Sequence, residues 1–169
     1  MAAIAEAVGA PIGSLYHRFP SRELLLARLW IRTIRRFQLG FVDALADDDL
    51  DVAAIRAALH GLRWARGHAD EARVLLLYRR EDLAARWPAE LGEDLAVLNK
   101  GVEAAVRDHA RQRYGSDGDE HLQRLMFALA DLPYAAMRRY IATGESPPAA
   151  IEDLVATACR CILATDQPD

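Results

Sequence analysis

The chain has 169 residues, 52% of them apolar, and a formal net charge of −4. That length can bury a sizeable core, either as one large domain or as a small head on a larger body. The acidic balance argues against a generic nucleic-acid binder, and no run of about 18 apolar residues could span a bilayer. Alanine and leucine outnumber β-branched residues, which predicts an all-α fold. No signal peptide opens the chain, so we expect a cytoplasmic protein without membrane contact.

The first structured stretch, residues 4–26, reads IAEAVGAPIGSLYHRFPSRELLL and predicts two short helices followed by the start of a third. Gly9 suits the position just past a helix end, where a left-handed backbone is needed. Pro11 suits a first helical turn, and Phe19 before Pro20 should be extended. Ser21 can cap the third helix. Two short helices around a glycine-bearing turn form a helix-turn-helix.

The spacing of Ile4-Ala5, Gly9, Gly13 to His17, Phe19, Ser21-Arg22 and Leu25 resembles the DNA-binding segment of the TetR family of bacterial repressors. The resemblance covers about the first quarter of the chain, and the remainder is similar only in architecture. It implies that Ile12 and Gly13 meet base edges, and that Ser14, Tyr16, His17 and Arg22 meet phosphates. Hydroxyl, imidazole and guanidinium groups donate to phosphate oxygens, and an isoleucine can only touch a thymine methyl. Leu15 and Phe19, four residues apart, are instead expected in the core of the helical hairpin.

The family places a further helix and a flexible arm before this motif, whereas Met1 falls within the first turn of the family's second helix. Two explanations stay open: the true start lies upstream of Met1, or the DNA-binding end is incomplete. The charge distribution fits a DNA-binding head, since the basic residues before Asp43 outnumber Glu6 and Glu23. They are Arg18, Arg22, Arg28, Arg32, Arg35 and Arg36.

Residues 21–46 predict one long amphipathic helix. Its apolar stripe recurs at steps of three and four residues, through Leu24, Ala27, Ile31, Ile34, Phe37, Phe41 and Leu45. The resemblance implies that such a helix joins the DNA head to the body and shifts like a pendulum. We therefore divide the chain into a head with connecting helix, residues 1–46, and a ligand-binding and dimerisation domain, residues 47–169.

The body is expected to contain the remaining helices. Asp51 is expected to cap a helix that ends near Gly67, and the apolar run 74–78 predicts a central helix. One helix should run from Pro88 to about Tyr114, and another from about Leu122 should kink at Pro133. The last, from about Pro148 to Ala164, brings the expected total to eight.

Polar and aromatic residues within these helices are the candidates for a ligand pocket: Trp64, Tyr78, Trp87, Phe127, Asp131, Tyr134 and Met137. Asp131 stands out because a carboxylate between apolar neighbours must be paired, solvated or near a polar ligand. The resemblance implies that the last two helices form a homodimer interface, for which the last supplies Ile151, Leu154, Val155, Ala158 and Ile162.

Catalytic and metal-binding patterns are missing from the sequence. The five histidines are scattered singly, no glycine-rich phosphate loop occurs, and Cys159 and Cys161 point about 200° apart on a helix. We expect neither an enzyme nor a cofactor, and reduced thiols. The preferred hypothesis is a ligand-responsive repressor that binds palindromic operator DNA as a homodimer and is released by a small-molecule effector. The alternative is a helical small-molecule-binding or dimeric scaffold protein without a working DNA contact, with an enzyme third.

Overall fold

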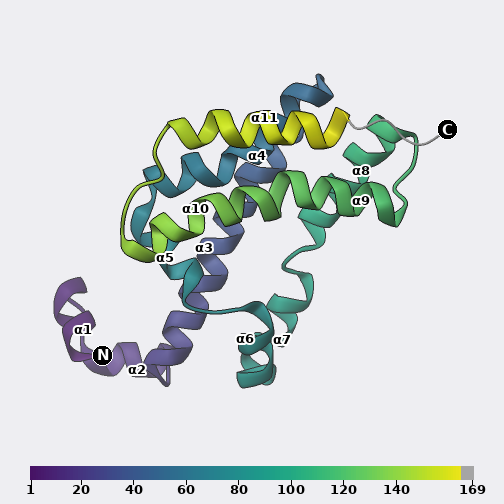
Figure 1. Ribbon diagram of the computed structural model, residues 1–169. Helices are drawn as coiled ribbons and strands as arrows, with labels where there is room; N and C mark the ends of the chain where they lie inside the picture. The colour runs from purple at the N-terminus through teal and green to yellow at the C-terminus, as the bar shows by residue number, and fades with distance from the viewer. Residues whose placement is uncertain (165–169) are drawn as a thin grey trace.

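The computed structural model describes residues 1–164, and every regular element in that range is a helix, which confirms the predicted all-α fold. The helices are α1 (Ala2–Val8), α2 (Ile12–Arg18), α3 (Arg22–Ala44), α4 (Leu50–Gly67), α5 (Ala69–Leu76), α6 (Arg80–Arg86), α7 (Pro88–Val97), α8 (Lys100–Tyr114), α9 (Asp119–Met126), the π-helical turn η1 (Phe127–Asp131), α10 (Leu132–Thr143) and α11 (Ala150–Ala164). Helices α1 and α2 stand apart at one end of the molecule, and α3 runs from them into the body (Figure 1).

The first three helices begin and end within two residues of the predicted positions. Gly9 takes a left-handed backbone with φ 63° and closes α1. Phe19 is extended, and the Ser21 hydroxyl accepts a hydrogen bond of 3.0 Å from the Leu24 backbone N–H. That N-cap satisfies one of the backbone donors that a helix start leaves free. The local geometry of a helix-turn-helix is therefore present.

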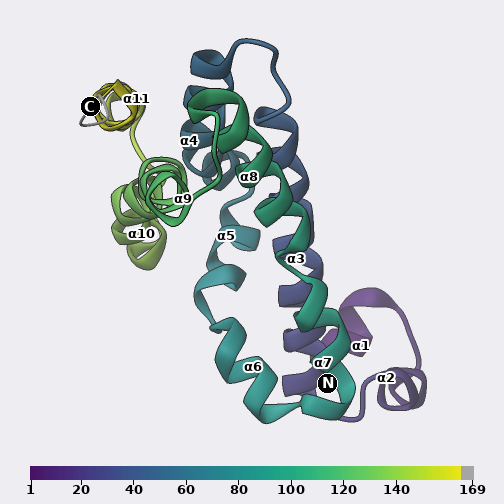
Figure 2. The ribbon, with the colours of Figure 1, turned by 90° about the vertical axis from the view of Figure 1, so that its right-hand side faces the viewer.

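Helix α3 packs along its whole length. Its first half forms a core with α6 and α7, and the buried residues of this cluster include Trp30, Ile31, Leu83, Leu91 and Leu95. Figure 2 shows α6 and α7 beside this half of α3. By packing, α3 belongs to the body, so only α1 and α2 form a separate head.

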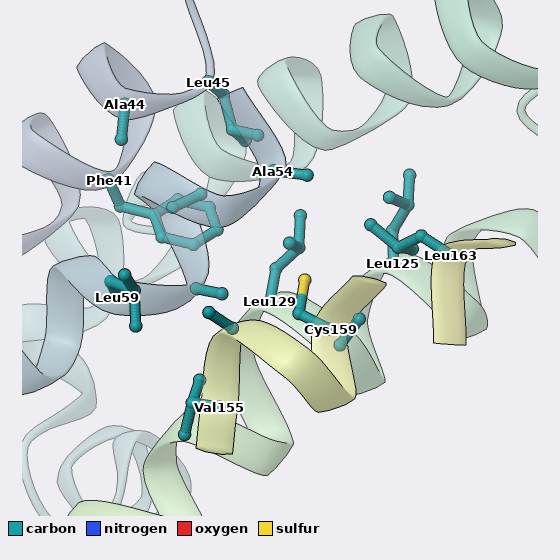
Figure 3. Packing of buried hydrophobic residues seen from close by; sticks show 14 of the residues in the cluster. Phe41, Ala44, Leu45, Ala54, Leu59, Leu125, Leu129, Val155, Cys159 and Leu163 are labelled. Atoms are coloured by element: carbon teal, nitrogen blue, oxygen red, sulfur yellow. The ribbon is translucent and has the colours of Figure 1, made fainter. Parts of the chain in front are cut away.

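The main core lies around α4, which contacts α3, α5, α10, α11 and η1. Ala53, Ala54, Ala57 and Ala58 are buried on α4, and such small side chains let several helices approach its axis closely. Leu129 and Cys159 lie side by side in this core (Figure 3). The expectation that residues 74–78 form the central helix is wrong: α5 ends at Leu76, and the Leu77 side chain is 56% exposed.

Several boundaries in the body differ from the prediction. Asp49 rather than Asp51 caps α4, because its carboxylate accepts from the backbone N–H groups of Asp51 and Val52. The separate short helix α6 was not predicted. The single helix expected from Pro88 is divided at Leu98 and Asn99 into α7 and α8.

Proline 133 acts through a π-helical turn. The Leu132 N–H bonds to the Phe127 carbonyl, five residues back, so η1 separates α9 from α10. Pro133 has no N–H to continue the regular ladder, and an inserted π turn accommodates that loss without ending the helical path. The kink expected at Pro133 stays a prediction, and the irregularity that the structure shows is the π turn before it. The residues around it, including Asp131, face differently from their places on a regular helix.

Candidate functional site

The six residues expected to contact DNA lie together on one exposed surface. Ile12, Gly13, Ser14, Tyr16 and His17 are on α2, and Arg22 opens α3. No side chain of α2 is buried, and Ile12 and Tyr16 are 46% and 50% exposed. These side chains are therefore accessible to a partner that approaches α2 from solvent.

Gly13 has no structural reason within the chain to be glycine. Its backbone is ordinary helix, and a Cβ built there would have no atom within 4 Å. Glycine in a helix costs about 1 kcal/mol relative to alanine. Space is thus left free on the outer face of α2, where an approaching backbone or phosphate would need it.

The basic character of residues 1–46 is smaller than the sequence suggests. Arg28 and Arg35 each donate to the Asp94 carboxylate at 2.7 Å, and Arg36 pairs with Glu71. Hydrogen bonding by Arg35 holds the pKa of Asp94 below its ordinary value. Within residues 1–164, Arg18, Arg22 and Arg32 have no such partner and remain available to an external anion; they are exposed.

The body contains three hollows that meet at one aromatic residue of α3, Phe37. One, of about 390 Å³, lies between α3, α8 and α9. A second, of about 250 Å³, lies between α3, α4 and α10, and a third, of about 150 Å³, lies between α3, α4, α5 and α10. Phe37 lines all three. The sequence places Phe37 on the apolar stripe of α3 but carries no signal that distinguishes it from the other stripe residues.

Four of the predicted ligand residues lie at these hollows. Trp64 meets Phe37 edge to face with ring centroids 5.3 Å apart, and Met137 and Tyr134 line both smaller hollows. Asp131 lines the 250 Å³ hollow with its side chain exposed, so solvent satisfies the carboxylate there.

The other three predicted ligand residues lie elsewhere. Tyr78 lines a neighbouring groove between α5 and α10. Trp87 packs against the core that α3 forms with α6 and α7. Phe127 is 52% exposed and lines neither the groove nor any of the three hollows. Trp87 and Phe127 therefore lie outside these spaces, because an amphipathic pattern cannot say which of two cores a residue joins or how η1 turns the helix.

A residue that the sequence analysis overlooked, His60, fixes the crossing of α3 and α4. Its ring lies 4.9 Å from that of Phe37, and Nε2 is 2.9 Å from the Phe37 backbone oxygen. Since a carbonyl only accepts, Nε2 carries the proton. Burial lowers the pKa of His60, which keeps the ring neutral at pH 7. The backbone of Phe37, the α3 residue that lines all three hollows, is thereby held to α4.

The expected dimer residues divide between two faces of α11. Val155 is 3% exposed and belongs to the core of its own chain, with Ile151 and Ile162 half-buried against that core. Leu154 is 66% exposed, and Ala158 lies at intermediate exposure beside it. The prediction that Val155 lies in a dimer interface is therefore wrong, because this side chain packs α11 against the body of its own chain. The apolar residue that points outward is Leu154.

Neither cysteine is in a disulfide, Cys159 being buried and Cys161 exposed. Among residues 1–164, no group of three or more His, Cys, Asp or Glu side chains is arranged to hold a metal ion. None of the helices described combines the length and apolar character that a membrane crossing requires.

No family model matches this chain, and comparisons with curated proteins and with solved structures found no match. The resemblance to TetR repressors therefore depends on the residues quoted from the first 25 positions.

Proposed function

We propose that the chain is a ligand-responsive transcriptional repressor that binds palindromic operator DNA as a homodimer. The observation that carries this proposal is the continuity of α3. Its first turn holds Arg22, beside the exposed surface of α2, and its second half supplies Ile34, Phe37 and Phe41 to the hollows. Its 23 residues span about 34 Å.

A single rigid helix that touches both places can couple them. A ligand that fills a hollow against Phe37 favours one position of α3 and therefore one position of α2. In a dimer, the two copies of α2 must fit major-groove sites about 34–36 Å apart. A modest tilt of α3 in each subunit changes that spacing, so the ligand releases the DNA.

The test uses duplexes selected from a random-sequence pool by the protein expressed with any in-frame codons upstream of Met1. We expect enrichment of a palindrome. Arg22→Ala should weaken binding to all duplexes alike and lower the salt slope by about one unit, because it removes a phosphate contact. Selection that enriches no sequence, with the protein folded and dimeric, would refute the repressor.

Gly13→Ala supplies a sharper comparison. The added methyl meets no atom of the chain, so the variant should be as stable as the parent or more stable by up to about 1 kcal/mol. Its operator affinity should nevertheless fall. Gly92→Ala, at another helical position with open space, is the control that should leave DNA binding unchanged. Unaltered operator binding by Gly13→Ala would remove α2 from the DNA interface.

A second function is supported by the weak packing of the head. Ala5 is the single buried side chain in α1 and α2, and three arginines of α3 are paired within the chain. This arrangement suits a helical small-molecule-binding or scaffold protein without a DNA contact. Ligand binding and dimerisation without enrichment of any duplex would favour this alternative.

A further inference from the structure

A groove of about 720 Å³ lies between the end of α5 and α10, outside the three hollows around Phe37. Arg73, Arg79 and Arg138 line it, together with Tyr78 and Tyr134. No carboxylate is among its described lining residues. Three arginines and no carboxylate thus line one space, an arrangement whose positive charge repels cations and attracts anions.

These three arginines differ from the others in the body. The other arginines of α4 to α11 pair with carboxylates, donate to a backbone carbonyl or lie against an aromatic ring, with the exception of Arg160. Arg73, Arg79 and Arg138 have no hydrogen bond or ion pair within residues 1–164. Three guanidinium groups that gather without an internal carboxylate are available to an anionic ligand.

The groove borders the smallest hollow. The two spaces adjoin, because both are lined by Leu75, Leu76, Tyr134 and Ile141. The hollow has a volume of about 150 Å³ and is otherwise apolar, with Trp30, Phe37 and Trp64 among its lining residues. A cavity of roughly that size, when apolar, accepts one benzene ring.

We propose that groove and hollow together bind an aromatic organic anion, with its ring in the hollow beside Phe37 and Trp64 and its carboxylate or phosphate on Arg73, Arg79 and Arg138. The reverse orientation is unfavourable, because the lining residues of the 150 Å³ hollow include no cationic side chain that could pair with an anionic head. The predicted effect of this ligand on DNA binding rests on the proposed repressor function. The binding of the ligand to the groove and hollow does not.

The test compares ligands that share a ring and linker and differ in the head: 4-phenylbutyrate, 4-phenylbutyl phosphate, 4-phenyl-1-butanol and 4-phenylbutylamine. Binding is measured without DNA, by calorimetry and by the fluorescence of the tryptophans. At least one of the two anions should bind at least about tenfold more tightly than the alcohol, and the amine should bind least. Which anion binds more tightly identifies the head. Raising the salt concentration to about 1 M should weaken the anion and leave the alcohol unchanged.

Variants of exposed arginines locate the head without threatening the fold. Arg79→Gln and Arg138→Gln should each weaken the anion by about tenfold, with unchanged affinity for the alcohol. Arg160→Gln, which removes the other unpartnered arginine of the body, is the matched control and should have no effect. Asp131→Asn should leave anion binding unchanged or strengthen it.

Any of three results would overturn the inference. The anions and the alcohol could bind with equal affinity, or Arg160→Gln could have the same effect as the groove variants. Alternatively, neither anion could bind at concentrations up to about 1 mM. These outcomes are separable from failure of the repressor. An anion that binds through the arginines in a protein that selects no duplex would retain the site and refute the regulatory function. If the protein binds an operator but none of the four ligands, the repressor proposal would stand and the anion site would be refuted.

Discussion

Gly40→Ala probes the contact that joins α3 to α4 beside the hollows. A Cβ built on Gly40 would lie 2.4 Å from Cε1 of His60 and 3.1 Å from Nε2. Real Cβ atoms do not approach other atoms so closely, so the imidazole or one of the helices must move. The ring has little freedom, because its Nε2–H donates to the Phe37 carbonyl and it packs at a tilt of 46° against the Phe37 ring.

Two opposing terms set the sign of the effect. Alanine in a helix interior gains about 1 kcal/mol over glycine. Against this stand the loss of the His60 hydrogen bond, about 0.5–1.5 kcal/mol, and the strain of overpacking, about 1–3 kcal/mol. The net destabilisation is therefore about 2 kcal/mol at the middle of these ranges. For a chain of this size, that change lowers Tm by about 4–8 °C.

The measurement is urea unfolding followed by circular dichroism at one fixed protein concentration. Gly92→Ala on α7, where a Cβ meets nothing within 4 Å, is the control and should stabilise the protein by up to about 1 kcal/mol. In a His60→Ala background the obstacle is gone, so Gly40→Ala should become stabilising. The reasoning is refuted if Gly40→Ala stabilises the parent as Gly92→Ala does, or if it destabilises the His60→Ala background by the same amount.

Three further results follow from the described contacts. Burial raises the pKa of the Cys159 thiol to about 11. A thiol reagent should therefore modify only the exposed Cys161 in the native protein and both cysteines in the unfolded protein. Rapid modification of two thiols in the native protein would contradict this. Burial lowers the pKa of His109 from its ordinary 6.5, so the unfolded chain binds more protons just below that pH and the free energy of unfolding should fall as pH drops through 6.5. His109→Gln should flatten that slope in urea titrations, and an unchanged slope would exclude His109 as its source. Leu154→Glu should change the stability of the monomer by no more than about 0.5 kcal/mol, since the side chain is 66% exposed. In sedimentation it should abolish the proposed dimer, whereas the control Ala104→Glu on α8 should not. A dimer that survives Leu154→Glu would exclude this face of α11 as the interface.

Local chemistry in the sequence is enough to predict the all-α class and the helix ends that carry a cap or a glycine stop. Gly9, Gly115 and Gly144 take positive φ where helices close, and Ser21 caps α3. Each of these signals acts within one turn of the chain, so the neighbouring residues contain all that is needed. The apolar stripe of α3 is equally local, since its period alone brings Leu24, Ala27 and Ile31 to one face. The exposed surface of α2 and the free position at Gly13 likewise follow from the short helix-turn-helix segment.

Only the tertiary structure decides which helices share a core and which charges stay unpaired. The apolar run 74–78 predicts a central helix, yet α4 takes that place because its buried alanines let several other helices pack close to its axis. Whether Trp87 lines a hollow or a core depends on where α6 and α7 dock on α3. Arg138 is distant in sequence from Arg73 and Arg79, and the three line one groove only because α5 and α10 lie side by side. Likewise, the need for glycine at position 40 exists only because His60 of α4 crosses there, and such non-local contacts have no counterpart in sequence periodicity.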